Sequence, residues 1–193
     1  MLAGGAGLRL VGEAAHRSKA AALLAGRPLV SYPLETLASV CGRTAVVCKR
    51  ETVLPGGLGP FERWNEPDEP RHPLAGIAHA LECAGSPILV CAADMPFVTA
   101  AACRELLTAS GDGGVCALAG GSGGVEPLFG VYPAGAEASL RTAAEAGASA
   151  RDSVALLEPV VLAFPSELMR SVNTPADLDA AAAELSRSTR PAG

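Results

Sequence analysis

The sequence has few of the residues and segments that mark several common protein classes. Aromatic residues make up 4% of the chain, and lysine provides only two of its fifteen cations. No apolar run approaches the roughly 18 residues of a membrane-spanning helix, and no basic segment precedes an apolar run as in a signal peptide. The net charge of −5 comes without a basic cluster, unlike a typical nucleic-acid-binding surface. We therefore expect neither a membrane nor a nucleic acid as a partner.

The cysteines do not indicate disulfides or a zinc site. None of the six belongs to a C-x-x-C pair, and several lie in apolar runs, such as Cys91 in ILVCAAD. Closely spaced cysteines and histidines, which zinc sites need, are not found. The pattern favours buried free thiols in the reducing cytoplasm.

Short apolar runs alternate with helical patterns along the chain. With 193 residues, of which 49% are hydrophobic, the chain is large enough for one domain with a full core. The alternation predicts an α/β, Rossmann-like, three-layer fold with a mainly parallel sheet and helices on both faces. We expect a single domain over 1–186 and a loose tail over 187–193. The predicted strands cover 45–48, 88–92, 115–119 and 160–164, and the predicted helices about 29–40, 74–84, 100–110 and 134–146.

Proline positions refine this prediction. Residues 126–133 form a further predicted strand, which Pro127 places at a sheet edge or at the start of the strand. Residues 54–73 hold five prolines and three glycines and are expected to form a long irregular connection. The last helix should begin after Thr174 as N-cap, with Asp177 at the third helical position.

The first strand is unusually short in the sequence. Only Met1–Ala3 precede the first glycine, whereas a strand of a doubly wound sheet usually has about five residues. Either this strand is short or the natural chain begins upstream of Met1, and we favour the second interpretation.

A glycine-rich segment follows the first strand and contains isolated cations. Gly4, Gly5 and Gly7 precede Arg9, and Lys19 stands ten residues further on. The segment matches neither the P-loop nor the dinucleotide fingerprint. Backbone N–H groups and two cations could bind the phosphates of a nucleotide, and an ordinary turn with surface cations explains the same residues.

The segment Gly120–Gly124 matches the G-x-S-x-G elbow of hydrolases around Ser122. That elbow needs a helix directly after the serine, whereas a strand-like segment follows here. The histidines His16, His72 and His79 all precede the serine, contrary to the hydrolase order. A hairpin connection is the better interpretation.

Three other residues lie where a ligand could bind. Asp94 follows an apolar strand, at the sheet edge where open α/β sheets bind ligands, and its carboxylate suits Mg²⁺ or a turn cap. Gly76 stands in the first turn of a predicted helix, where it allows either close approach of a ligand or plain packing. Lys49 ends a predicted strand, and we expect it to be solvated.

In order along residues 2 to about 185, the chain contains LAGG with a following arginine and lysine, PLAG, ADMPF, EPLFGVYP and NTPADL. This chain resembles the molybdenum cofactor guanylyltransferases. The resemblance implies a Rossmann-like nucleotidyltransferase fold and transfer of GMP from GTP to the phosphate of Mo-molybdopterin, with release of pyrophosphate. LAGG and PLAG favour GTP over CTP.

The resemblance also implies roles for individual residues. Arg9, Lys19 and Asp94 would act in catalysis, the two cations by binding the triphosphate and Asp94 by binding Mg²⁺ as the cofactor. Asn173 would lie near the acceptor. The implied nucleotide-binding residues are Leu2, Ala3, Gly4, Gly5, Lys19, Asn65, Asp68, Gly76 and Asp94.

The chain departs from the family pattern at several of these positions. Lys19 stands between serine and alanine instead of in D-K-G. Asn65 replaces the aspartate that contacts the nucleotide, with Asp68 nearby as a substitute, His72 replaces the glycine before PLAG, and Ser171 replaces one asparagine of N-x-N-T-P. These changes keep the nucleotidyltransfer class and leave the base preference and the acceptor open.

Several functions therefore remain open at this stage. The expected partners are GTP and Mo-molybdopterin or another phosphorylated small molecule, supplied in the cytoplasm, with molybdopterin-handling proteins as further partners. The alternatives are a CTP-dependent cytidylyltransferase, a nucleotidyltransferase for another acceptor, and a GTP-binding regulator that has lost catalysis. A hydrolase is the weakest alternative, for the reason of chain order given above.

Overall fold

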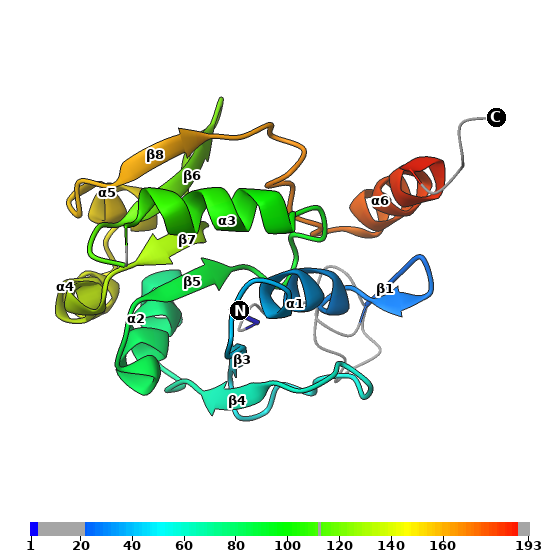
Figure 1. Ribbon diagram of the computed structural model, residues 1–193. Helices are drawn as coiled ribbons and strands as arrows, with labels where there is room; N and C mark the ends of the chain where they lie inside the picture. The colour runs from blue at the N-terminus through cyan, green and yellow to red at the C-terminus, as the bar shows by residue number, and fades with distance from the viewer. Residues whose placement is uncertain (4–21, 112, 189–193) are drawn as a thin grey trace.

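The computed structural model of the chain describes residues 1–3, 22–111 and 113–188 (Figure 1). Four residues of the predicted site lie outside the described residues: Gly4, Gly5, Arg9 and Lys19.

The core of the fold is a sheet to which residues from both halves of the chain contribute. Strand β3 (Ala45–Cys48) pairs in parallel with β4 (Glu62–Asn65). Four further strands pair in the order β5-β7-β6-β8 (Figure 1). Their bounds are Ile88–Cys91 for β5, Ala117–Gly121 for β6, Gly124–Tyr132 for β7 and Val160–Ala163 for β8.

Residues 1–3 join these two parts of the sheet. Leu2 forms parallel bridges to Val47 on one side and to Ala92 on the other. The Leu2 N–H donates to the Cys91 carbonyl at 2.9 Å, and the Ala3 N–H donates to the Val47 carbonyl at 2.8 Å. The first segment therefore lies between the two parts of the sheet, although its sheet pairing rests on a single residue.

Strand β7 is the reversed strand of a sheet that is otherwise parallel among its described strands. It pairs antiparallel with both β5 and β6, so the prediction that Pro127 marks a sheet edge or a strand start is wrong. The register shifts from Leu118–Gly130 to Ala119–Glu126, which places Pro127 in a bulge, where no ladder hydrogen bond from its nitrogen is needed. The predicted hairpin at Gly120–Gly124 is confirmed by the β6–β7 turn.

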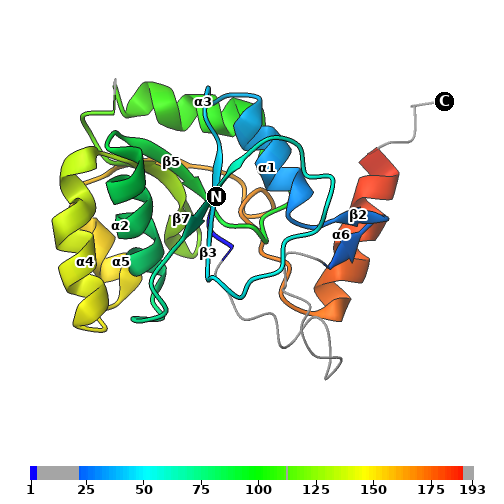
Figure 2. The same ribbon diagram turned by 90° about the horizontal axis from the view of Figure 1, so that it is seen from below.

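Helices cover both faces of the sheet, as predicted (Figure 2). Alternate residues of the central strands point to opposite faces, so that Val90 and Tyr132 belong to one core cluster and Cys91 and Val131 to the other. The helices of one face are α2 (Pro73–Ala84), α4 (Glu137–Glu145) and α5 (Ala150–Ala155), and those of the other are α1 (Ser31–Ala38) and α3 (Ala100–Ala109). A short 3₁₀ turn, η2 (Ala134–Ala136), precedes α4.

A third, smaller cluster joins residues near the β1–β2 hairpin to the last helix. Strands β1 (Leu23–Leu24) and β2 (Arg27–Pro28) form a hairpin that packs against α6 (Pro175–Ser188) (Figures 1 and 2). The predicted helix start is confirmed, because Thr174 Oγ1 accepts the Asp177 N–H at 3.1 Å and Asp177 Oδ2 accepts the Thr174 N–H at 2.8 Å. Helix α6 extends two residues beyond the predicted domain end at residue 186.

The sequence analysis missed three short parts of the fold. Strand β4 lies within 54–73, the segment that the prolines and glycines marked as irregular. The β1–β2 hairpin and α5 were not predicted, because each is only a few residues long and has too little periodicity to be recognised.

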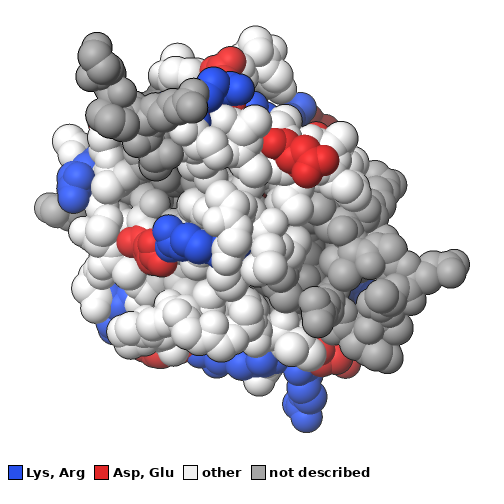
Figure 3. All heavy atoms as spheres, turned by 90° about the vertical axis from the view of Figure 1, so that its right-hand side faces the viewer, with Lys and Arg blue, Asp and Glu red and all other residues white. Residues whose placement is uncertain are grey.

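Two expectations from the composition concern membrane-spanning helices and cysteines. No helix within the described part of the chain is long and apolar enough to cross a membrane. All six cysteines are free thiols, and four of them are buried as predicted, whereas Cys41 is half-buried and Cys83 is exposed. On the face shown in Figure 3, acidic and basic side chains lie in small groups separated by uncharged atoms.

Candidate active site

The strand ends at the carboxyl edge of the sheet bring several predicted site residues together. The Leu2 carbonyl accepts the Ala93 N–H at 2.9 Å, so Asp94 follows directly beside the end of the 1–3 segment. The Val172 N–H donates to the Asp94 carbonyl at 2.9 Å, which places Asn173 beside the same turn. Asp94 is half-buried and Asn173 is exposed. The 1–3 segment and the two predicted polar residues therefore share one edge of the sheet.

Helix α2 begins at the same edge. The His72 side chain caps this helix, because its Nδ1 accepts the Leu74 N–H at 3.2 Å. A Cβ atom at Gly76 would lie 2.9 Å from Glu66 Oε2 and 3.4 Å from Leu2 Cδ2. The glycine thus allows the helix to pack closely against the 1–3 segment and Glu66, which is the packing alternative. Its contact with a nucleotide remains a prediction.

Two charged residues at this edge were not predicted as part of the site. Lys49 and Glu66 follow β3 and β4, and their side chains are only 10% and 9% exposed. Lys49 Nζ lies 3.6 Å from Glu66 Oε1 and also donates to the Pro67 carbonyl. The prediction that Lys49 is solvated is wrong, because the strand end that carries it is covered. The scarcity of lysine in the chain was the available sequence signal.

Burial raises the pKa of the Glu66 carboxyl above its ordinary value. The positive charge of Lys49 opposes this effect without cancelling it. Taking a carboxylate out of water is unfavourable unless a cation and hydrogen bonds compensate for the lost solvation. Glu66 is therefore a carboxylate whose charge depends on the ammonium group beside it.

Asn65 and Glu66 point in different directions, and only Glu66 faces Gly76. Side chains alternate along β4, and Trp64 lines a pocket together with Ala80 of α2, so Trp64 and Glu66 point to the α2 face. Asn65 points to the opposite face, where its Oδ1 accepts a hydrogen bond from Arg63 Nε at 2.9 Å. Asp68 is exposed, two residues beyond Glu66. The roles expected of Asn65 and Asp68 remain predictions.

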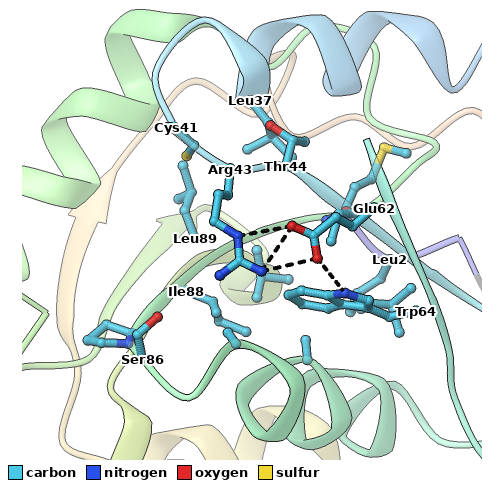
Figure 4. A pocket seen from close by; sticks show the side chains of 18 of the residues that line it. Leu2, Leu37, Cys41, Arg43, Thr44, Glu62, Trp64, Ser86, Ile88 and Leu89 are labelled. Atoms are coloured by element: carbon cyan, nitrogen blue, oxygen red, sulfur yellow. Dashed lines mark hydrogen bonds and ion pairs between the residues drawn. The ribbon is translucent and has the colours of Figure 1, made fainter. Parts of the chain in front are cut away.

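A pocket of about 430 Å³ opens at the other edge of the sheet (Figure 4). Its lining includes Ala45, Glu62 and Ile88, the first residues of β3, β4 and β5. Since these strands are parallel, the pocket lies at their amino ends and away from Asp94. Arg43 and Trp64 bind the Glu62 carboxylate there, with the Arg43 Nε to Glu62 Oε1 distance at 2.9 Å. Among the predicted site residues that the structure describes, only Leu2 lines this pocket.

Comparison with known proteins identifies the family of this chain. Residues 1–160 match the family described as the MobA-like NTP transferase domain. The chain belongs to this family. A molybdenum cofactor guanylyltransferase from Cereibacter sphaeroides is 32% identical over 185 residues, which cover 92% of this chain and 91% of that protein. Membership in the MobA-like family supports an enzyme of the nucleotidyltransferase class and confirms the resemblance found in the sequence.

Solved structures of MobA-like and related proteins share the fold. Molybdopterin-guanine dinucleotide biosynthesis protein A from Archaeoglobus fulgidus superposes with a TM-score of 0.69 at 25% identity, covering 96% of this chain and 97% of that one. A nucleotidyl transferase from Methanothermobacter gives a TM-score of 0.72 at 21% identity, covering 97% of this chain and 96% of that one. The predicted Rossmann-like nucleotidyltransferase fold is confirmed.

The donor set at the carboxyl edge of this MobA-like chain is compatible with Mg²⁺. No group of three or more His, Cys, Asp and Glu side chains gathers as a metal cage within 1–3, 22–111 and 113–188. Mg²⁺ does not need such a cage, because it is commonly held by one or two carboxylates together with waters and substrate phosphates. The half-buried Asp94 carboxylate, at the end of β5, offers oxygen ligands of the preferred kind.

Proposed function

We propose that the protein transfers the guanylyl group of GTP to the terminal phosphate of Mo-molybdopterin and releases pyrophosphate. The similarity to the guanylyltransferase from C. sphaeroides, over almost the whole of both chains, supports the donor and the acceptor. The observation that carries the proposal is the convergence of Leu2, Gly76 and Asp94 at one sheet edge. Residues from three distant parts of the sequence thus lie where α/β sheets bind nucleotides.

In this reaction, an oxygen of the acceptor phosphate attacks the α-phosphorus of GTP. The new P–O bond forms as the bond between the α-phosphorus and the pyrophosphate oxygen breaks, and the leaving pyrophosphate takes the electron pair. The attacking oxygen is already anionic, so no general base is needed. The task of the protein is to hold two anions in line and to stabilise the charge on the leaving group.

The residues of the edge would divide this task. Asp94 would hold Mg²⁺, which supplies positive charge beside the phosphates when it is bound. Arg9, Lys19 and the amides of Gly4 and Gly5, which lie outside the described residues, would bind the triphosphate. Asn173, beside the Asp94 turn, would contact the acceptor.

The proposal also includes the source of the acceptor and the cellular compartment in which the protein acts. Mo-molybdopterin would be delivered by molybdopterin-handling proteins in the cytoplasm. The free state of all six cysteines supports a reducing environment.

The test is pyrophosphate release from GTP or CTP with Mo-molybdopterin as acceptor and Mg²⁺ present. We expect release from GTP that depends on the acceptor, and little from CTP. Release from CTP alone would instead identify a cytidylyltransferase. Binding of GTP without pyrophosphate release, with the pterin or with a panel of sugar phosphates, would identify a regulator and overturn the proposal.

A further inference from the structure

The pocket at the amino ends of β3, β4 and β5, here called the amino-edge pocket, reaches the helices of both faces of the sheet. Its lining includes Ala45 and Ile88, the first residues of β3 and β5. Leu37 of α1 lines it from one face, and Ala80 of α2 lines it from the other (Figure 4). A cavity that lies between two strands and touches helices of both faces has the location of a strand of the sheet.

Residues 1–3 pair with the two strands that flank this pocket. The Met1 carbonyl accepts the Val47 N–H at 2.9 Å, and the Leu2 N–H donates to the Cys91 carbonyl at 2.9 Å. Met1 and Leu2 also line the pocket. The pairing of the 1–3 segment with β3 and β5 therefore leads directly into the cavity.

The register of this pairing gives the length of chain that the cavity would take. Leu2 lies beside Ala92 in a parallel bridge. About three residues before Met1 would therefore extend the pairing to Ile88, where β5 begins. In a parallel ladder the hydrogen bonds recur at every second residue, so the Leu89 carbonyl would accept the N–H of the first of these residues.

The hydrogen bond of the Met1 amine suits a peptide group better than a charged one. The Met1 ammonium group donates to the Ala45 carbonyl at 2.8 Å. Burial lowers the pKa of this amine from 8.0 to about 6, because removal from water disfavours the charged form. A peptide N–H at the same position would keep the hydrogen bond without burying a charge. The local chemistry thus favours a chain that continues through the pocket.

The alternation of side chains indicates which residues would fit. Met1 belongs to the core cluster of α1 and α3, and Leu2 packs against the cluster of α2. The residues of a preceding segment would continue to point to these two faces in turn, where Leu37 and Ala80 line the pocket. Strands that are buried on both faces are apolar at consecutive positions, so every residue of the segment should be apolar.

We propose that the amino-edge pocket accepts an extended apolar segment joined to Met1, which pairs in parallel between β3 and β5 and lengthens the strand begun by residues 1–3. The segment has about three residues in the pocket and forms hydrogen bonds to the strands on both sides. The pocket is then an interaction surface for backbone and apolar side chains. It lies at the edge opposite Asp94 and does not depend on the proposed function.

The test adds the residues Val-Ile-Val before Met1 by cleavage of an amino-terminal fusion. The comparison proteins are the unextended chain and the chain with Gly-Ser-Gly at the same place. The apolar extension should raise the urea midpoint above those of both comparison proteins. It should also slow hydrogen exchange of the Ala45 and Cys91 amides, measured by NMR, by about tenfold or more relative to Gly-Ser-Gly, as expected for a new backbone hydrogen bond.

A third extension, Val-Asp-Val, separates pairing in the pocket from a general effect of added chain. Its middle residue would point to the face of Leu37, which is apolar and buried. A carboxylate placed there without a partner is unfavourable, so this extension should not raise the urea midpoint.

Two outcomes would overturn the proposal. Equal urea midpoints and equal exchange rates for the Val-Ile-Val and Gly-Ser-Gly chains would show that the pocket does not accept the segment. Dimers of the Val-Ile-Val chain in sedimentation, with unchanged exchange of the Ala45 and Cys91 amides, would show that the segment pairs with a second copy instead.

Discussion

Strands β3 and β4 carry an ion pair at each end, and the two pairs have opposite properties. At the amino edge, the side chains of Arg43 and Glu62 are 69% and 46% exposed. At the carboxyl edge, those of Lys49 and Glu66 are 10% and 9% exposed. Hydrogen bonding to Arg43 lowers the pKa of the Glu62 carboxyl, whereas burial raises the pKa of the Glu66 carboxyl.

The two pairs differ in how strongly each charge depends on its partner. Exposed pairs contribute little to stability, because water already solvates both charges. A buried pair has a desolvation cost that can exceed the attraction between its charges, and removing one partner leaves the other charge uncompensated. The buried pair lies at the sheet edge that holds the predicted site residues, and the exposed pair lines the pocket at the other edge.

The largest effect should come from removing the cation of the buried pair. Lys49→Met leaves the Glu66 carboxylate without its ammonium partner and should lower the free energy of unfolding by about 3–5 kcal/mol. Urea unfolding at neutral pH measures the change. The double variant Lys49→Met/Glu66→Leu should recover most of the loss, because two apolar side chains remove the uncompensated charge. A single variant as stable as the wild type would show that the pair is not coupled.

Asp94→Asn should lower the reaction rate without lowering the stability of the fold. We expect pyrophosphate release to fall by about 10²- to 10³-fold, by analogy with the loss of one charge-stabilising contact in other enzymes. The urea midpoint should change little, because the amide has the size of the carboxyl group. We expect a similar loss of rate for Lys19→Ala. Near-normal rates in either variant would remove that residue from the mechanism.

The two glutamates should give opposite pH dependences of stability. The folded-state pKa of Glu66 is raised, so its folded form binds a proton more tightly, and its contribution falls as pH rises from about 4.5 through the folded pKa. The pKa of Glu62 is lowered, so its contribution is present above about 4.5 and is lost as pH falls through the folded pKa. Urea unfolding midpoints of Glu66→Gln, Glu62→Gln and the wild type, measured from below pH 4.5 to above it, would show whether the two contributions change in opposite directions. Identical profiles for the two variants would contradict the assigned environments.

The smallest effect should come from the exposed pair. Arg43→Ala removes the partner of a solvated carboxylate and should leave both the urea midpoint and the turnover close to those of the wild type. The measurements are the same unfolding and pyrophosphate assays. A marked loss of turnover in this variant would connect the amino-edge pocket to the reaction.

The sequence was sufficient where local patterns and order along the chain determine the structure. The alternation of apolar runs and helical patterns predicted the layers, and the Thr174–Asp177 spacing predicted the start of α6. Position after an apolar strand was enough to place Asp94 at the carboxyl edge. These features depend on neighbours in the sequence, which is why a pattern can reveal them.

The sequence was insufficient where contacts between distant segments determine the structure. Pro127 lies inside the sheet because a bulge removes the need for its missing N–H, and no local pattern reveals a bulge. Lys49 is buried because the segment after β4 covers it. The choice between Asn65, Glu66 and Asp68 depends on which face of β4 turns toward α2, and motif spacing alone selected Asn65.

The most direct test of the central claim is a crystal structure of the protein with Mg²⁺ and a non-hydrolysable GTP analogue. We expect the nucleotide to lie across the carboxyl edge, with its phosphates beside Asp94. A nucleotide in the pocket formed by Arg43, Glu62 and Trp64, or one that leaves Asp94 without contact, would contradict the account.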